Sequence, residues 1–599
     1  MKLKFPYGYS NFETIINDGH LFIDRTAHIH QLEETGRNIL FLRPRRFGKS
    51  LFLSILENYY DVAKADRFEE LFGQLAIGQN PTPSHNQYFV LKWDFSKWNF
   101  SSANSQGVQR SLHDHINNAI KEFLVYYQSF LEVEINQTDA FISFQSLITA
   151  VRFTPYQLYL LVDEYDSFAN ELMRRGSAGQ QQLFDSEGLL RYMFKVIKGK
   201  FSSRGLTRIF MTGVLPMVKS DMGSGHLIAH NIYFEPEFND LCGFHETEVE
   251  QMVQQVTDNC GLSAERAVEM MDILRAYYGG YRFVSPFYKA APTDSNLYNP
   301  TLILYFLKYF QEHCDYPHTM LDSNLAPDRR KIEYVAQLSG GPELVQRAVN
   351  EQEPLSVPKI TGRFEVQEML EAENDDTLAS SLLYYLGMLT FEGGITPMGR
   401  LKLRIPNLTI RGLYFERLQK ILLPNFNKNE LEKVAKTFYT TGNLQPTCDL
   451  IEARFNALDN RDYRTADEFS VKVAFLSVLF NNIFYLIDSE TELQRGYADL
   501  TMIIRPDMRQ YQLLDHVIEF KYLKLSETEL SGAEVRALSE DELRALPKVQ
   551  AKLNDADSQL SRYQHGLYEI YGDKLRLQNH TVVSVGFERV VWTRHGEES

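Results

Sequence analysis

Residues 43–50 read Arg-Pro-Arg-Arg-Phe-Gly-Lys-Ser and follow a short β-rich run. A strand, a loop and then a helix form the context of a phosphate-binding loop, in which backbone N–H groups at the helix start surround phosphate oxygens. In such a loop Lys49 contacts the β and γ phosphates, the Ser50 hydroxyl ligates Mg²⁺, and Gly48 lets the backbone come close. The first glycine of the usual pattern is Arg43 here, so a basic loop that binds no nucleotide is the alternative interpretation.

A second motif, Tyr-Leu-Leu-Val-Asp-Glu at residues 159–164, ends an apolar run with two carboxylates. Buried parallel strands deliver such acids to the carboxyl edge of a sheet, where a phosphate loop also lies. We expect Asp163 to hold Mg²⁺ and Glu164 to polarise the attacking water. A solvated acidic turn is the competing interpretation, but the order and separation of the two motifs favour nucleotide hydrolysis. Thr212, at the end of a later strand, either senses the γ-phosphate or caps a turn.

A third group of polar residues lies near the C-terminus. Asp499 stands at the start of one apolar strand, and Glu519 and Lys521 lie two residues apart in the next. Residues two apart face the same side of a strand, so Glu519 and Lys521 project together, and a hairpin brings Asp499 beside them. Two carboxylates with a lysine suit Mg²⁺-dependent cleavage of a phosphodiester. The alternative is an exposed Glu/Lys pair on an edge strand.

Gln559 and Tyr563 follow at a spacing of four, which places them on one face of a predicted helix. They either line the same site or, in the case of Tyr563, pack in the core. The long acidic segment between Lys521 and Gln559 covers the site or contacts another subunit. Residues 455–599 hold 17 Lys and Arg against 24 Asp and Glu, a net charge of −7, which weakens the case for tight DNA binding by this part alone.

These residues need elements that position them. In the first third of the chain β-rich runs alternate with helix-period stretches, which predicts a parallel α/β sheet. The expected strands there span residues 38–42, 88–94, 158–162 and 208–212, and the expected helices span residues 51–60 and 108–127. The last part is expected to contain a helix at 469–481 and strands at 498–504, 513–522 and 581–590.

The pattern of elements divides the chain into four parts. We predict a phosphate-loop α/β domain at residues 1–234, a helical or winged lid at 235–325, a helical connector at 326–454 and a second α/β domain at 455–599. A length of 599 residues agrees with roughly four domains. The predicted fold class is therefore α/β, with two sheets that serve two different sites.

Composition narrows the function further. Hydrophobic residues make up 44% and charged residues 23% of the chain, as in folded globular proteins. The net charge of −16 disfavours a protein that binds polyanions through bulk charge. No apolar run predicts an export signal or a membrane span. The four cysteines (Cys242, Cys260, Cys314 and Cys448) are scattered, which argues against a disulfide framework or a cysteine-based zinc site and makes the cytoplasm the simplest compartment.

The first half of the sequence resembles the predicted AAA-ATPase-like family of bacterial proteins. The resemblance rests on the motifs at residues 6–8, 22–26, 43–50, 162–166, 211–214, 238–244 and 277–283. The Arg-Pro-Arg-Arg start of the loop is usual in that family, so the absence of the first glycine is diagnostic of the family and no longer an objection to a phosphate loop. It implies an ATP-binding module akin to archaeal-type and STAND P-loop proteins, which act as switches or oligomerising motors. The expected ATP-binding residues are Arg45, Arg46, Phe47, Gly48, Lys49, Ser50 and Thr212.

The C-terminal part resembles the PD-(D/E)XK nuclease superfamily, and more closely the nuclease-like family that often follows the AAA-ATPase-like module. This resemblance implies that Asp499, Glu519 and Lys521 form the catalytic core, with Asp499 and Glu519 as metal ligands. It adds Glu468, at the start of the preceding helix, as a fourth acid. It also implies that Gln559 and Tyr563 line the site.

The leading hypothesis is an ATP-controlled nuclease that uses Mg²⁺ at both sites, with Mn²⁺ as an option at the nuclease site. Nucleic acid is the expected partner of the C-terminal domain, a homo-oligomer is compatible with the motifs, and no membrane association is expected. The alternative is an ATP-dependent signalling or scaffold protein in which the nuclease fold has become a non-catalytic binding module. The acidic C-terminal domain motivates that alternative, and the complete Asp/Glu/Lys set opposes it.

Overall fold

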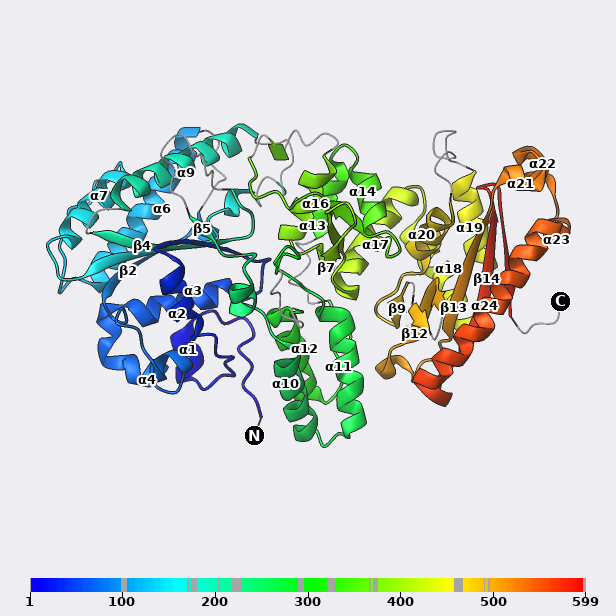
Figure 1. Ribbon diagram of the computed structural model, residues 1–599, viewed down its shortest axis with the longest axis horizontal. Helices are drawn as coiled ribbons and strands as arrows, with labels where there is room; N and C mark the ends of the chain where they lie inside the picture. Colours follow the sequence, from blue (N-terminus) through cyan, green and yellow to red (C-terminus); the bar gives the residue numbers. More distant parts are fainter. Residues whose placement is uncertain are drawn as a thin grey trace. The chain divides into compact units, whose positions relative to one another are not determined.

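The computed structural model describes residues 2–98, 105–169, 173, 180–201, 205–217, 229–288, 296–321, 329–365, 368–369, 375–456, 467–489, 491–493 and 496–595 (Figure 1). These residues form two compact units. The first comprises residues 1–314, 324–341 and 356–406, and the second comprises residues 315–323, 342–355 and 407–599. The division into four parts at residues 234, 325 and 454 stays a prediction.

The first unit contains a five-stranded sheet in the order β2-β3-β4-β1-β5. All its neighbouring strands are parallel, as the alternation of strands and helices predicted. Its strands are β1 (Asn38–Leu42), β2 (Tyr88–Asp94), β3 (Gln157–Asp163), β4 (Leu206–Gly213) and the two-residue β5 (His230–Asn231). The sequence predicted β1 and β2 at these limits and missed β5. Strand β4 lies between β1, which leads into the phosphate loop, and β3, which carries Asp163.

Helices cover both faces of this sheet. Figure 1 shows α6, α7 and α9 on one face and α1, α2 and α3 on the other. Their bounds are α1 Phe12–Asn17, α2 His28–Thr35, α3 Lys49–Tyr60, α6 Ser105–Tyr126, α7 Ala140–Val151 and α9 Gln180–Phe201. Short helices α4 (Phe68–Phe72) and α5 (Ala76–Gln79) follow α3. Because helices cover both faces of the sheet, its strands are buried on both sides. Each helix needs only one apolar face, the one that packs on the sheet.

Three helices, α10 (Glu246–Asn259), α11 (Ala264–Tyr278) and α12 (Pro300–His313), make up most of the segment expected to be a helical lid. Isolated bridges pair Phe244 with Tyr298 and Tyr281 with Leu297. A disulfide joins Cys260, at the end of α10, to Cys314, at the end of α12. The scattered cysteines argued against a disulfide framework and gave no sign of this one bond, because the two residues are far apart in sequence and meet only when α10 and α12 pack together. Cys242 and Cys448 are free and buried.

The segment expected to be a helical connector is only partly helical. It contains a three-stranded sheet in the order β6-β8-β7, with β6 at Leu355–Val357, β7 at Thr390–Ile395 and β8 at Leu401–Arg404. Its helices are α13 (Arg329–Gln337), α14 (Gly341–Ala348), α16 (Asp376–Tyr385), α17 (Leu408–Leu422), α18 (Lys428–Thr441) and α19 (Gln445–Phe455). Short strands beside long helices left a weak periodic signal, which explains the incomplete prediction.

The second unit is built on a five-stranded mixed sheet in the order β15-β14-β13-β12-β9. Its strands are β9 (Tyr485–Asp488), β12 (Leu500–Ile504), β13 (Asp515–Leu523), β14 (Leu577–Val585) and β15 (Arg589–Arg594), and β10 (Thr491–Leu493) pairs separately with β11 (Gly496–Ala498). The run predicted as one strand at 581–590 is in fact a hairpin that turns at Gly586, which has a φ of 55°. The run predicted at 498–504 is interrupted at Asp499, between β11 and β12.

Helices α20 (Glu468–Leu479) and α24 (Pro547–Tyr571) pack on β13. The long segment between Lys521 and Gln559 forms α21 (Leu525–Thr528), α22 (Gly532–Ala537), α23 (Glu540–Ala545) and the start of α24. Its leucines and valines join those of β13, β14 and β15 in one apolar cluster. This segment is therefore part of the core of the second unit. Throughout the described ranges, every helix is too short or too polar to cross a bilayer.

Candidate functional site

The phosphate loop of the first unit has the backbone shape that a cradle for anions needs. Gly48 has a φ of 104° and Arg46 a φ of 69°, a region that L-residues rarely adopt. Gly48 is followed directly by α3, so the free N–H groups of the first helical turn point into the loop. Such an arrangement binds a phosphate through the backbone and the helix dipole.

Lys49 is 5% exposed, and its ammonium lies over its own loop. Its Nζ donates to the carbonyl oxygens of Arg43 at 2.9 Å and Pro44 at 3.0 Å. Burial lowers the pKa of Lys49, although the charges of Glu164 and Asp163 oppose the change. The lysine is thus directed at the loop that would surround a phosphate, and it is held there by carbonyl groups.

Arg43, which replaces the first glycine of the usual loop, is a buried structural residue. Its guanidinium donates to the carbonyl oxygens of Leu42 at 3.0 Å, Tyr233 at 2.8 Å, Phe238 at 3.0 Å and Asn239 at 3.1 Å. It also lies 4.3 Å above the ring of Phe283. Burial lowers its pKa to about 10. The side chain therefore ties the loop to the segment after β5 and to the lid.

The other residues of the loop divide between core and rim. Phe47 is 1% exposed, and its ring packs edge-to-face on Tyr281 at 5.0 Å and Phe283 at 5.2 Å. It can reach a phosphate only through its backbone. Arg45 is partly exposed, with its guanidinium 3.8 Å from the Glu164 carboxylate. The Arg46 carbonyl accepts from the Thr301 hydroxyl at 3.0 Å.

Asp163 and Thr212 lie together at the carboxyl edges of β3 and β4. The Thr212 hydroxyl donates to Asp163 Oδ1 at 2.6 Å, and the Glu164 N–H donates to the same oxygen at 3.0 Å. Thr212 thus positions Asp163, a role that neither sequence interpretation included. Glu164 has a φ of 48°, and non-glycine residues in this region are enriched at functional sites.

Asp166 is a site residue that lies within one of the sequence motifs but had no predicted role. Its carboxylate accepts from the N–H groups of Val214, at 3.0 Å, and Leu215, at 2.7 Å. Burial raises its pKa to about 6. A Cβ on Gly213 would lie 2.4 Å from Asp166 Oδ1, so only glycine fits there. Asp166 fixes the turn after β4 and with it the end of the strand that carries Thr212.

The donor set at this edge fits a nucleotide with Mg²⁺. The Ser50 hydroxyl and Asp163 Oδ2 have no hydrogen-bond partner among the residues that the structure describes. Both are oxygen ligands of the kind that Mg²⁺ takes beside phosphate groups. Ser50, Asp163 and the ammonium of Lys49 are therefore the groups that would hold a metal and a triphosphate.

In the second unit, strand pairing brings the C-terminal polar residues together. Leu500 pairs with Ile518 across the antiparallel β12 and β13, so Asp499 lies next to Glu519. Asp499 Oδ2 accepts from the N–H of Phe520 at 2.8 Å. Lys521 Nζ donates to Glu519 Oε1 at 2.7 Å. The Glu/Lys pair stands on the central strand of the sheet, which excludes the edge-strand alternative.

Burial gives this cluster unusual electrostatics. Asp499 is 7% exposed, Glu519 2% and Lys521 9%. Burial and the adjacent Asp499 raise the pKa of Glu519 to about 7, against the opposing effect of Lys521. Burial alone would lower the pKa of Lys521, but the hydrogen bond and charge of Glu519 raise it. Two buried carboxylates with one ammonium leave the cluster short of positive charge, which a metal ion would supply.

The helices around β13 supply the remaining predicted residues. Gln559 Oε1, on α24, accepts from Lys521 Nζ at 3.0 Å. Tyr563 is 6% exposed and packs in the apolar cluster between α24 and the sheet, and burial, together with the charges of Glu519 and Asp499, raises its pKa. The core packing of Tyr563 is confirmed, and its role in lining the site stays a prediction. Glu468, at the start of α20, accepts from the N–H of Tyr522 at 3.2 Å.

The residues present fit a hard divalent ion with few protein ligands. Within the described part of the chain, no three or more His, Cys, Asp or Glu side chains converge as a metal-binding group. Glu519 Oε2, however, is buried without a hydrogen-bond partner among the described residues, and a buried carboxylate oxygen in that condition is expected to have a ligand. Mg²⁺ is often bound by one or two carboxylates together with substrate phosphates, and Asp499 and Glu519 supply two.

Two family models match parts of the chain, and neither match covers half of it. Residues 6–223 match the family model described as a predicted AAA-ATPase, and residues 467–576 match that of the PD-(D/E)XK nuclease superfamily. A protein of Azotobacter chroococcum mcd 1, described as an uncharacterized protein in the vnfD 5′ region, is 26% identical over 433 residues, which cover 70% of this chain and 71% of that protein. Among solved structures, the Aeropyrum pernix ORC1 protein in complex with DNA matches with a TM-score of 0.22 and 11% identity, over 66% of this chain and 93% of that one.

Proposed function

We propose that this chain, in which one segment matches a predicted AAA-ATPase and another the PD-(D/E)XK nuclease superfamily, is an ATP-controlled, metal-dependent phosphodiesterase that acts on nucleic acid. The observation that carries the proposal is the buried cluster of Asp499, Glu519 and Lys521, in which Glu519 Oε2 lacks a partner among the described residues. A purely structural Glu/Lys pair would not need an unpaired buried oxygen.

The residues of the second unit have distinct roles in this reaction. A bound Mg²⁺ or Mn²⁺ would polarise the scissile phosphate and activate water. Asp499 and Glu519 would hold the ion, and the Phe520 N–H orients Asp499. Lys521, kept charged by Glu519 and oriented by Gln559, stabilises the charge that develops on the phosphate oxygens. Glu468 and Tyr563 border this cluster.

The first unit would supply the control. Its loop contacts the lid through Arg43 and Phe47, which lie against Phe283 and Tyr281. A change in loop shape on ATP binding would therefore act directly on the packing of the lid. Lys49, Ser50 and Asp163 would bind the triphosphate and its Mg²⁺, and Glu164 would polarise the attacking water.

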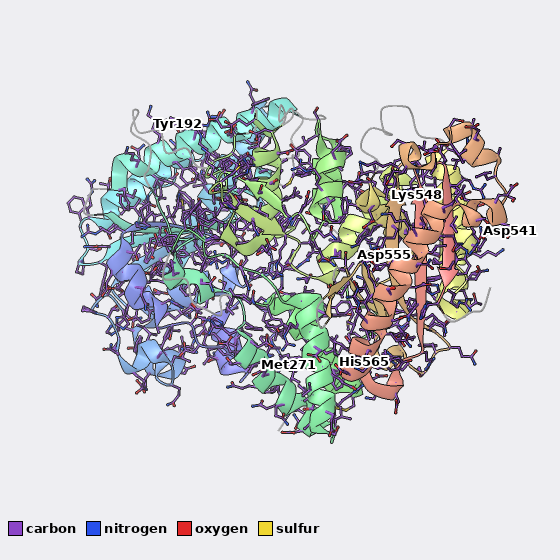
Figure 2. All side chains as sticks on the ribbon, turned by 45° about the vertical axis from the view of Figure 1, so that its right-hand side comes forward. Tyr192, Met271, Asp541, Lys548, Asp555 and His565 are labelled. Carbon is purple, nitrogen blue, oxygen red and sulfur yellow. A yellow bond between two sulfur atoms is a disulfide. The ribbon has the colours of Figure 1, made fainter. Side chains whose placement is uncertain are left out.

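A nuclease panel tests the proposal. Single- and double-stranded DNA and RNA are incubated with the full chain and Mg²⁺ or Mn²⁺, with and without ATP. We expect metal-dependent cleavage that Lys521→Ala abolishes. Lys548→Ala is the matched control. This lysine lies exposed on α24 (Figure 2), and its replacement removes the same charge from the same unit. Equal cleavage by wild type and Lys521→Ala, at equal folding by circular dichroism, would sink the assignment.

The acidic charge of the C-terminal part favours one other function, a binding module that has lost catalysis. Mn²⁺ titration of the full chain, compared with its Asp499→Asn variant, separates the two functions. If the site is catalytic, the full chain binds one Mn²⁺ that the Asp499→Asn variant does not bind. If the site has lost catalysis, the two proteins bind the same amount of Mn²⁺. ATP hydrolysis does not distinguish them, because both functions include it.

A further inference from the structure

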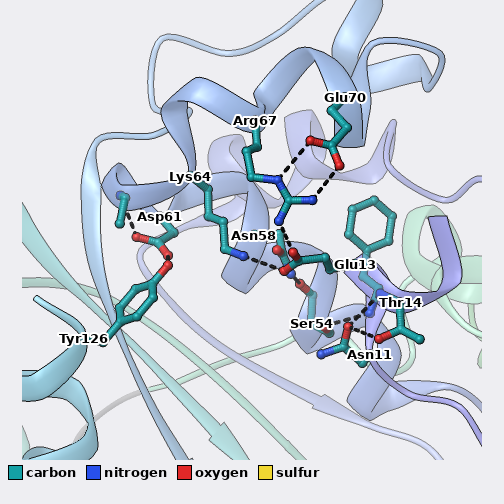
Figure 3. Close-up of polar contacts among 12 residues, drawn as sticks. Asn11, Glu13, Thr14, Ser54, Asn58, Asp61, Lys64, Arg67, Glu70 and Tyr126 are labelled. Atoms are coloured by element: carbon teal, nitrogen blue, oxygen red, sulfur yellow. Dashed lines mark hydrogen bonds and ion pairs between the residues drawn. The ribbon is translucent and has the colours of Figure 1, made fainter. Parts of the chain in front are cut away.

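A second polar cavity lies in the first unit, at the opposite end of α3 from the phosphate loop. It has a volume of about 280 Å³ and is bordered by the end of α3, by α1, β2 and α6. Figure 3 shows part of its wall, in which the Lys64 ammonium points at Glu13 and the Tyr126 hydroxyl points at Asp61. None of these residues belongs to the nucleotide site or the nuclease cluster.

The charges of the lining are unbalanced. Four acids line the cavity, Glu13, Glu57, Asp61 and Glu122, against the two lysines Lys64 and Lys92. Both lysines are already in ion pairs, Lys64 with Glu13 and Lys92 with Glu57 at 3.1 Å. Asp61 is buried and accepts hydrogen bonds from the hydroxyls of Tyr127, at 2.7 Å, and Tyr126, at 2.8 Å. The lining therefore has a net charge of −2, and both of its lysines are already paired with acids.

The polar atoms of the lining that still lack a partner in the described chain are all hydrogen-bond acceptors. Asn58 is 6% exposed, its Nδ2 donates to the Ser54 carbonyl at 2.8 Å, and its Oδ1 has no partner among the described residues. Glu57 uses one carboxylate oxygen for Lys92, and Glu122, which is exposed at the mouth of the cavity, makes no hydrogen bond or ion pair within the described chain. A buried amide oxygen without a donor is unfavourable. The cavity thus calls for a ligand that donates hydrogen bonds and carries positive charge.

We propose that this cavity binds a small aliphatic diamine. Two protonated nitrogens would balance the charge of the lining and donate to Asn58 Oδ1, Glu57 and Glu122. The chain of methylene groups between them would pack on the apolar part of the wall, which Val90, Phe123 and other side chains provide. A metal ion would leave that apolar wall unused, and an anion would meet the wrong charge.

Equilibrium dialysis of the full chain with radiolabelled 1,4-diaminobutane, without divalent cations and in 0.1 M salt, tests the proposal. We expect one bound diamine per chain and no binding of butane-1,4-diol, its uncharged analogue. Glu57→Gln and Glu122→Gln should each weaken binding about fivefold, as the loss of one partly exposed charge contact does. Lys92→Met frees Glu57 and makes the lining more negative, so it should tighten binding about fivefold; an anion site would respond in the opposite way.

Asp114→Asn is the matched control, because Asp114 is exposed on the same helix as Glu122, about 12 Å away along its axis. It should leave the affinity unchanged, since it alters the total charge without touching the cavity. The proposal is overturned if wild type takes up no diamine, if the diol binds equally well, or if Asp114→Asn weakens binding as much as Glu122→Gln. Displacement of the diamine by stoichiometric Mg²⁺ would also overturn it, because it would assign the cavity to a metal.

Discussion

Replacing Arg43 by glycine restores the usual phosphate-loop pattern in the sequence, and we predict that it destabilises the first unit. The substitution removes all the donors that the guanidinium provides to the carbonyl oxygens of Leu42, Tyr233, Phe238 and Asn239. At about 1 to 1.5 kcal/mol for each hydrogen bond, this loss amounts to about 4–6 kcal/mol. Glycine also gives the unfolded loop more freedom, which adds up to about 1 kcal/mol.

The gain that opposes this loss comes from no longer burying a charge. The pKa of Arg43 falls from 12.5 to about 10, a difference that corresponds to about 3 kcal/mol. The net destabilisation is therefore about 3 kcal/mol, which for a unit of this size lowers the melting temperature by about 4 °C. ATP affinity should not improve, because Arg43 holds the loop in position.

Differential scanning calorimetry of the full chain measures the effect. Arg45→Gly is the matched control, since it makes the same replacement two residues later, where the guanidinium is partly exposed and 3.8 Å from Glu164. A surface pair at that distance contributes less than about 1 kcal/mol. If Arg43→Gly melts within about 2 °C of wild type, or no lower than Arg45→Gly, the hydrogen bonds of Arg43 do not stabilise the first unit and the reasoning is refuted.

Five other measurements address the sites and the lid. Lys49→Ala should reduce ATP affinity at least about tenfold in fluorescence titrations, and Glu164→Gln should bind ATP but hydrolyse it slowly in single-turnover assays; full turnover by Glu164→Gln would place the base elsewhere. Because Glu519 has a pKa of about 7, Mn²⁺ affinity measured by calorimetry should fall about tenfold per pH unit below pH 7. Without metal, the effect of pH on stability has the opposite sign. The pKa of Glu519 is raised above 4.5 in the folded chain, so this group stabilises the fold below pH 4.5, and the contribution is lost as the pH rises through 7. Melting in EDTA should therefore occur at a higher temperature at pH 5.5 than at pH 8. Reduction of the Cys260–Cys314 disulfide, whose cysteines are 54 residues apart, should destabilise the lid by up to about 4 kcal/mol, seen as a lower melting temperature with a phosphine reductant; an unchanged melt would contradict this.

Local patterns in the sequence predicted the features that depend on local order. Strands β1 and β2 have the predicted limits, and the pairing of Asp499 with Glu519 follows from alternation along two adjacent strands. The hairpin at Gly586 was missed because apolar residues continue on both sides of a short turn. In the same way, a run of β-forming residues hid the interruption at Asp499.

Features that depend on distant contacts could not be predicted in this way. The acceptors of Arg43 include carbonyl groups about 190 residues further along the chain, and a carbonyl group carries no signature of side-chain type. The bonds from Val214 and Leu215 to Asp166 are also made by the backbone. Cys260 and Cys314 meet only because α10 and α12 pack together. In each case the partner is set by tertiary packing, so residue type and spacing do not reveal it.

Helix α3 is shared by two of the proposed ligands. Its first residue, Lys49, belongs to the nucleotide site, and Glu57 and Asn58, near its other end, belong to the diamine cavity. A twelve-residue helix is about 18 Å long and moves largely as one body. Any free energy of coupling along it must be reciprocal: the factor by which ATP changes the affinity for the diamine equals the factor by which the diamine changes the affinity for ATP. The amine concentration in the cell would then change how much ATP the chain binds, and the ATP concentration would change how much amine it binds.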